Sequence, residues 1–177
     1  REVEFHAFAQ WLAERSLARA QQRARAARMK LGIVADLAIG TDPGGSQAWS
    51  RPEELLRGVS VGAPPDPFNP LGQSWGITAQ SPEALRTRGF APWLDLLRAN
   101  LAHVGGLRID HALGLMRLWL VPDGAGAADG AYLRYPVADL LRLLCLEASR
   151  ARAIVVGEDL GTVPEHFHSR TRPRGLL

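Results

Sequence analysis

The sequence predicts an α/β fold in which helices alternate with the strands of a parallel sheet. Three short apolar runs, at 31–40, 105–110 and 153–159, have the length of buried strands rather than helices. Each run follows a longer stretch in which apolar residues recur at helical spacing. A helix that leads into a buried strand is the unit from which parallel sheets are assembled, so the expected class is α/β.

The first of these units begins with a helix expected at about 5–28. This stretch is rich in Ala, Leu, Arg and Gln, and Phe5, Phe8 and Leu12 begin an apolar stripe at three-to-five spacing, which is typical of an amphipathic helix. The run 31–40, LGIVADLAIG, follows it and is expected to be the first buried strand.

Residues 40–92 differ from the rest and are expected to form one long inserted loop. They contain many of the glycines and prolines, with Trp49, Phe68 and Trp75 among them. Because long irregular insertions are uncommon in compact domains unless they are functional, this segment is expected to contribute to a site.

Two further units complete the α/β pattern. A helix is expected at 92–103, where proline stands at the start, and it leads into the strand GLRID at 106–110. A helix at 137–150 then leads into the strand at 153–159. Periodicity is lost in the tail, 160–177.

Composition and charge exclude several classes of protein. With 46% hydrophobic and 22% charged residues, the chain is neither disordered nor fibrous. The net charge of +3 is a mild excess, and the basic residues are mixed with acidic ones, which is atypical of nucleic-acid binding. Cys145 is the only cysteine and no apolar run approaches 18 residues, so a cytoplasmic protein without disulfides or membrane spans is expected.

The strand GLRID ends in charged residues, and alternation along it separates two faces. Leu107 and Ile109 share one face, whereas Arg108 and Asp110 share the other. In a parallel α/β barrel the helix-facing side is apolar, and charges gather at the carboxyl ends of the strands, where catalytic groups lie. Arg108 and Asp110 are therefore expected to face a site.

The other two strands repeat this arrangement, with Asp36 near the end of the first and Glu158 near the end of the third. Each acid alone is most simply interpreted as a helix cap or a loop carboxylate. Their recurrence at three strand ends favours a shared site, because clustering like charges is unfavourable unless a ligand or a reaction uses them.

Two carboxylates on neighbouring strands match the chemistry of glycoside cleavage. A retaining glycosidase holds its two carboxyl groups about 5 to 5.5 Å apart, one as nucleophile and one as acid and base. Arg108 favours the ionised form of Asp110, which suits it to attack. Apolar Ile154 and Val156 precede Glu158 and favour its protonated form, which suits it to donate a proton.

Four stretches together resemble the 4-α-glucanotransferases, also called amylomaltases or disproportionating enzymes, of glycoside hydrolase family 77 in the α-amylase clan. They are IVADLAIGTDPGG, GVSVGAPPDPFNPLGQSWG, GLRIDHALGLMRLWLVPDGA and AIVVGEDLGTVP, in the family's order, and the likeness runs from about Val3 to Glu165. The resemblance implies an α-retaining transglycosylase on a (β/α)8 TIM barrel, which transfers α-1,4-glucan segments between maltodextrins.

The resemblance also assigns roles to individual residues. It makes Asp110 the nucleophile, Glu158 the acid/base and Arg108 the residue that positions the nucleophile. It implies substrate binding by four residues: Asp36, Gln73, Trp75 and His111.

The family's third catalytic acid, in a His-Asp pair on a later strand, has no counterpart in this sequence. The resemblance therefore implies that 1–177 is an internal fragment of one catalytic barrel domain, with only the central βα units of a partial (β/α)8 TIM barrel and impaired activity. A barrel of this type takes about 250 residues.

Other interpretations stay open at this point. The alternatives are an α-amylase-type hydrolase, which uses the same two acids, and a non-catalytic α-glucan-binding fragment. Met116 and Trp119, spaced by three, are interpreted as packing residues. His166 and His168 lie in a polar tail without a carboxylate cluster, so no metal is expected, and no organic cofactor either. The oligomeric state is left open.

Overall fold

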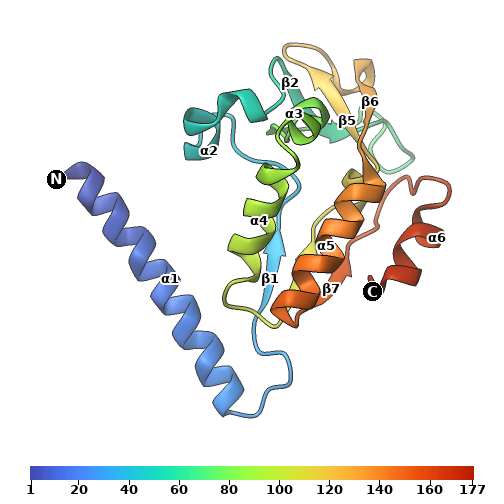
Figure 1. Ribbon diagram of the computed structural model, residues 1–177. Helices are drawn as coiled ribbons and strands as arrows, with labels where there is room; N and C mark the ends of the chain where they lie inside the picture. Colours follow the sequence, from blue (N-terminus) through green and yellow to red (C-terminus); the bar gives the residue numbers. More distant parts are fainter.

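The structure, a computed structural model, describes residues 1–177 and contains two separate sheets (Figure 1). One sheet has three parallel strands in the order β1-β4-β7. The other has four antiparallel strands in the order β3-β2-β5-β6. Four short 3-10 turns lie between the elements: Pro52–Glu54, Ala112–Leu115, Ala127–Asp129 and Arg172–Arg174.

The three predicted strands are confirmed as neighbours in the parallel sheet. They are β1 (Val34–Leu37), β4 (Gly106–Ile109) and β7 (Ile154–Gly157), each shorter than the apolar run that predicted it. In the register, Asp36 lies beside Arg108 on the neighbouring strand, and Arg108 lies beside Val156. Asp36 is the third residue of β1, so the strand extends one residue beyond it.

Two helices cover the parallel sheet, as the sequence predicts. They are α4 (Ala91–Leu101) and α5 (Val137–Ala151), which lie side by side in front of the strands (Figure 1). Leu107 and Ile109 of β4 are completely buried in a core cluster of 17 residues that both helices share. The predicted separation of faces along this strand is therefore confirmed.

The stretch 40–92 is more regular than the expected loop. It contains two short helices, α2 (Ser46–Ser50) and α3 (Pro82–Thr87), and two strands, β2 (Val59–Ala63) and β3 (Gln73–Ile77). These strands form a sheet with segments far along the chain, β5 (Arg117–Pro122) and β6 (Ala131–Arg134). Because the pairing is between distant segments, local sequence patterns did not reveal it.

The antiparallel sheet has a small core of its own. Val61, Ala79 and Leu118 form a separate cluster of three buried residues. A Cβ on Gly62 would come within 2.0 Å of the backbone oxygen of Gln73, so the approach of β3 to β2 requires glycine there.

The predicted first helix is confirmed as α1 (Glu2–Ala26), but its apolar stripe is not covered. The helix projects away from the two sheets (Figure 1), and none of its residues is buried. Its attachment lies near its C-terminal end, where Gln21 donates to the backbone oxygen of Leu31 (3.0 Å) and accepts from the N–H of Ile33 (2.7 Å).

The C-terminal segment, without periodicity in the sequence, forms the short helix α6 (Phe167–Thr171). Phe167 and Leu176 belong to the large core cluster. The last residue, Leu177, exchanges two backbone hydrogen bonds with β7, through Gly157 (2.9 Å) and Val155 (3.1 Å).

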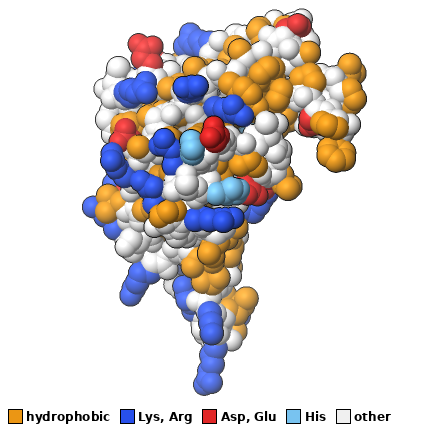
Figure 2. Space-filling model, turned by 90° about the vertical axis from the view of Figure 1, so that its right-hand side faces the viewer, with side chains coloured by type: hydrophobic (Ala, Val, Ile, Leu, Met, Phe, Trp, Pro, Cys, Tyr) orange, Lys and Arg blue, Asp and Glu red, His pale blue; other side chains and the backbone are white.

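The architecture is thus mixed α/β, with parallel strands that form an open sheet. No helix has both the length and the apolar content to cross a membrane. On the face shown in Figure 2, Lys and Arg side chains are interspersed with acidic, histidine and hydrophobic ones, and several of them lie on the tapering lower end.

Candidate active site

The predicted charged residues of β1 and β4 form one ion-paired group. Nη1 of Arg108 donates to both carboxylate oxygens of Asp36, at 2.7 and 2.8 Å, and Nη2 lies 2.9 Å from Oδ1 of Asp110. The hydrogen bond that Arg108 donates to Asp36, followed by the one it donates to Asp110, raises the pKa of its guanidinium above the ordinary value. Arg108 therefore stays charged and keeps both acids in fixed positions.

Asp110 and Glu158 follow directly on neighbouring strands. Ile109 and Gly157 pair in the register of β4 and β7, so the two acids occupy the next positions. The backbone N–H of Glu158 donates to the oxygen of Ile109 (2.9 Å), which fixes the two strand ends against each other. The expectation that adjacent parallel strands bring these acids to one edge is confirmed by this register.

The carboxylate of Glu158 is held by backbone donors. Oε2 accepts the N–H of His111 at 2.9 Å, and Oε1 accepts the N–H of Leu160. These two bonds fix the carboxyl group between the turn that follows β4 and the loop that follows β7. This anchoring was not predicted, because a sequence does not reveal which backbone N–H groups will face a side chain.

His111 links the acids to an aromatic side chain. It adopts a left-handed backbone conformation (φ 46°, ψ 56°), which directs its N–H toward Glu158. Its ring meets the Trp75 ring edge-on at 5.2 Å between centroids. Burial lowers the pKa of the imidazole below 6.5, although Glu158 and Asp110 act in the opposite direction, so the ring is neutral near pH 7.

A cavity of about 560 Å³ opens beside the acids, within the size range of small-molecule sites. Gln73, Trp75 and His111, three of the residues predicted to bind substrate, line it. Nε1 of Trp75 donates to Oε1 of Gln73 (2.9 Å), which fixes the indole ring relative to the carboxamide.

Part of this cavity wall was not predicted from the sequence. Arg117, Trp119 and Tyr132 also line the cavity, although Trp119 was interpreted as a packing residue. The alternation in RLWL could have revealed it, because Leu118 is buried in the small core while its neighbours face the opposite side of β5.

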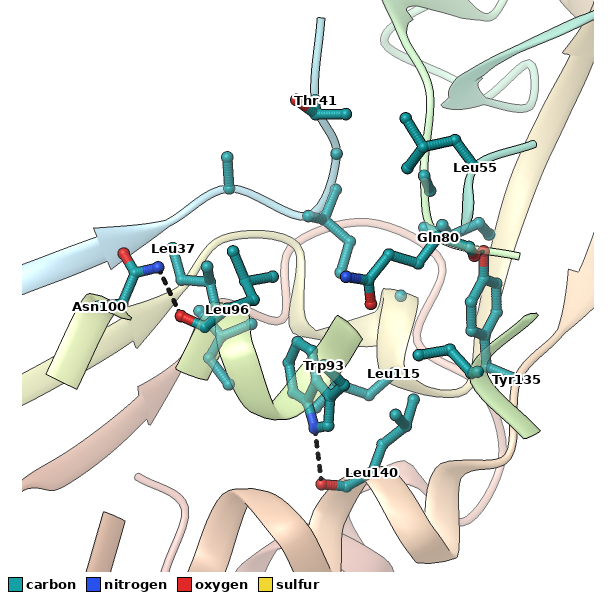
Figure 3. A pocket seen from close by; sticks show the side chains of 18 of the residues that line it. Leu37, Thr41, Leu55, Gln80, Trp93, Leu96, Asn100, Leu115, Tyr135 and Leu140 are labelled. Carbon is teal, nitrogen blue, oxygen red and sulfur yellow. Dashed lines mark hydrogen bonds between the residues drawn. The ribbon is translucent and has the colours of Figure 1, made fainter. Parts of the chain in front are cut away.

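The predicted site residues do not all share one cavity. Asp36 lines a second, largely apolar cavity of about 320 Å³, together with Leu37, Trp93 and Gln80 (Figure 3). Arg108, Asp110 and Glu158 line neither cavity and lie at the open ends of the parallel strands. Ion pairing through Arg108, rather than a shared pocket, joins Asp36 to the acids.

The structure contains no group of three or more His, Cys, Asp or Glu side chains arranged to hold a metal ion. Nε2 of His166 lies 3.4 Å from Oε1 of Glu165, and Nε2 of His168 lies 3.6 Å from Oδ2 of Asp159. The two histidines of the tail therefore contact different carboxyl groups.

A family model described as 4-alpha-glucanotransferase matches residues 1–177. The chain belongs to this family. A 4-alpha-glucanotransferase of Haemophilus influenzae is 46% identical over 163 residues, and one of Mycobacterium bovis is 47% identical over 175 residues. These alignments include 92% and 99% of this chain, but only 23% and 24% of the relatives, so the chain spans about a quarter of their length.

Solved structures agree with this assignment. The amylomaltase of Corynebacterium glutamicum is 44% identical and superimposes with a TM-score of 0.94 over 98% of this chain and 25% of that enzyme. An amylomaltase of Streptococcus agalactiae, in complex with acarbose, is 22% identical with a TM-score of 0.69, over 80% of this chain and 30% of the other, and supports the fold alone. The resemblance of the four sequence stretches to this family is thereby confirmed.

Proposed function

We propose that this chain carries the central part of a 4-α-glucanotransferase site, which transfers α-1,4-glucan segments between maltodextrins with retention of configuration. One observation above all supports this: two acids follow adjacent parallel strands, and a cavity lined by Gln73, Trp75 and His111 opens beside them. A pair of carboxyl groups next to a site for a sugar is what a double displacement requires.

Asp110 is the proposed nucleophile. Its Oδ1 is engaged by Arg108, and Oδ2 is the oxygen proposed to attack. Attack on the anomeric carbon forms a carbon–oxygen bond to Asp110 and breaks the glycosidic bond, and the departing 4-hydroxyl takes a proton from Glu158. The guanidinium of Arg108, 2.9 Å from Oδ1, orients the carboxylate for this step.

Glu158 is the proposed acid and base. In the second half of the reaction its carboxylate accepts the proton of an acceptor sugar's 4-hydroxyl, whose oxygen then displaces Asp110 from the anomeric carbon. The hydrogen bonds from the backbone N–H groups of His111 and Leu160 hold this carboxyl group in place.

The binding roles follow from the cavity. Trp75 offers an indole ring against which the apolar face of a pyranose can pack, and Gln73 and His111 offer polar atoms to its hydroxyl groups. The neutral imidazole can both donate and accept a hydrogen bond. Asp36 acts through Arg108, whose guanidinium it holds in place.

In the longer protein, we propose that β1, β4 and β7 form part of a (β/α)8 barrel in a single catalytic domain. The open parallel sheet and the helices on one of its faces support this arrangement. The chain by itself is then expected to transfer slowly, because the third acid that the family resemblance implies lies outside it.

The test is to incubate the chain with maltotriose and analyse the products, while NMR measures binding. Slow formation of glucose together with longer maltodextrins, lost in Asp110→Asn and Glu158→Gln, is the expected result. Asp123→Asn is the matched control. Asp123 is exposed, does not line the 560 Å³ cavity and is not one of the charged residues at the ends of the parallel strands. Shorter sugars alone would favour the hydrolase, and binding without products would favour the glucan-binding fragment. If maltotriose neither binds nor reacts, the proposed function is refuted.

A further inference from the structure

We infer that the cavity beside the acids contains a second sugar-binding surface, formed by Arg117, Trp119 and Tyr132, which binds glucan units distant from Asp110 and Glu158. This inference rests on the proposed function, because it specifies what part of the substrate the far wall of the same cavity contacts. This surface then determines how the affinity of the chain for a glucan depends on the length of that glucan.

The topology separates this surface from the one near the acids. Trp75 lies on β3 and Tyr132 on β6, which are the two edge strands of the antiparallel sheet. With neighbouring strands ~4.8 Å apart, the two edges lie about 14 Å from each other. That span exceeds the width of a single pyranose ring, so we expect the sugar unit that packs on Trp75 and the unit that reaches Tyr132 to be different units of one glucan chain.

The three side chains are held as one unit by contacts among themselves. Trp119 and Tyr132 pair across β5 and β6, and their rings meet edge-on with centroids 5.0 Å apart. The guanidinium of Arg117 lies 3.9 Å from the Tyr132 ring centroid, and Nε1 of Trp119 donates to the backbone oxygen of Ala127 (2.9 Å). Aromatic rings fixed in this way bind a ligand without losing much side-chain freedom.

Arg117 has unused hydrogen-bond donors. Its Nε is buried without a partner, and its one hydrogen bond, from Nη2 to the backbone oxygen of Thr162, is long at 3.5 Å. A guanidinium carries five N–H donors, and a buried donor without a partner is costly. Because Arg117 lines the cavity, sugar hydroxyl oxygens are suitable acceptors for its remaining donors.

The surface also touches the loop that follows Glu158. Leu160, Gly161 and Thr162 line the same cavity, and Arg117 reaches this loop through its bond to Thr162. A glucan unit bound at Arg117 therefore lies between β5 and the loop whose Leu160 N–H holds Glu158.

The experiment measures the affinity of the chain for maltose, maltotriose, maltotetraose and maltohexaose by isothermal titration calorimetry. In the wild-type chain we expect affinity to increase with length, and in Tyr132→Ala we expect the gain from maltotriose to maltohexaose to fall about tenfold, with little change for maltose. Arg117→Lys is expected to have the same effect to a smaller extent, because lysine keeps the charge but loses the planar donors.

Two further variants distinguish a failure of the proposed function from a failure of the second sugar-binding surface. Trp75→Ala is expected to weaken binding at every length, whereas Trp49→Ala, which removes an exposed tryptophan outside the cavity lining, is expected to change nothing. If no maltodextrin binds the wild-type chain, the proposed function itself fails. If maltodextrins bind and Tyr132→Ala leaves the length dependence unchanged in a chain that circular dichroism shows to be folded, the second surface is refuted.

Discussion

In both sheets the side chains alternate between a buried core and a candidate site, but the two cores differ in size. In the parallel sheet, β4 buries Leu107 and Ile109 in a cluster of 17 residues and presents Arg108 on the other face. In the antiparallel sheet, β5 buries Leu118 in a cluster of only three residues and presents a cavity wall. The large core fixes the acids, whereas the small one carries the proposed glucan surface.

The difference in core size indicates which sheet is expected to resist local unfolding more strongly. Elements with few buried contacts open at lower free energy than elements in the main core. The acids therefore lie on the sheet with the larger core, whereas Gln73, Trp75 and the proposed glucan surface lie on the sheet with the smaller one.

Replacing a fully buried leucine in each sheet compares the two cores directly. We expect Leu107→Ala to lower the free energy of unfolding by about 4 kcal/mol and Leu118→Ala by about 2 kcal/mol, since more neighbours lose contacts around Leu107. Urea denaturation followed by circular dichroism measures both. Equal losses would contradict the division into a strong and a weak core.

Gly62→Ala tests the antiparallel sheet at the closest approach of two strands. The new Cβ would meet the backbone oxygen of Gln73 at 2.0 Å, so β3 has to move away from β2. We expect a loss of about 1–3 kcal/mol in stability, and weaker maltohexaose binding because Gln73 and Trp75 move with β3.

Gly44→Ala is the matched control for this substitution. The nearest atom to a Cβ at Gly44 is a side-chain oxygen of Asp42 at 3.5 Å, an ordinary contact distance. Stability and binding are expected to change little. If Gly62→Ala behaves like Gly44→Ala, the close approach of the two strands has no bearing on the site.

The parallel sheet could be predicted from the sequence because each of its units is local. A helix, a short turn and an apolar strand follow one another, and the residues of β4 alternate between core and site. The antiparallel sheet could not be predicted in this way, because Gly62 pairs with Trp119 in a distant segment of the chain. For α1 the helix was predicted, whereas the exposure of its apolar stripe was not.

The candidate site shows the same contrast between features that local patterns predict and features that depend on distant segments. Alternation and strand ends placed Arg108 and Asp110 together, and the ion pair between them bears this out. The cavity wall of β5 and β6 was not predicted, since it depends on the pairing of Trp119 with Tyr132 on a neighbouring strand. The hydrogen bonds that anchor Glu158 come from backbone groups, which no pattern of side chains reveals.

Glu147→Gln tests how the helices over the parallel sheet are held together. Glu147 of α5 accepts from Arg98 of α4 at 3.1 Å, and this bond, followed by that from Arg150, lowers the pKa of the carboxyl group. Both arginines lie at the surface, where solvent screens the pairing, so we expect a loss of about 1 kcal/mol at most near pH 7.

The effect of Glu147→Gln is expected to depend on pH. A carboxyl group with a lowered pKa in the folded state stabilises the fold above its ordinary pKa of 4.5, and that contribution is lost as pH falls through the folded-state value. The difference between wild type and variant in urea denaturation should therefore shrink below about pH 4. A constant difference across this range would show that the charge of Glu147 contributes nothing.

The smallest expected effect concerns His111, which joins the two regions through its contacts with Glu158 and Trp75. Because burial lowers its folded-state pKa below 6.5, the unfolded chain binds more protons between the two values, and the free energy of unfolding rises with pH in that window. Stability is therefore expected to decrease slightly from pH 7 toward pH 5. His111→Asn, which tolerates the left-handed backbone, removes this dependence. An NMR titration of the His111 ring with a midpoint at or above 6.5 would show that the ring is not buried between the two sheets.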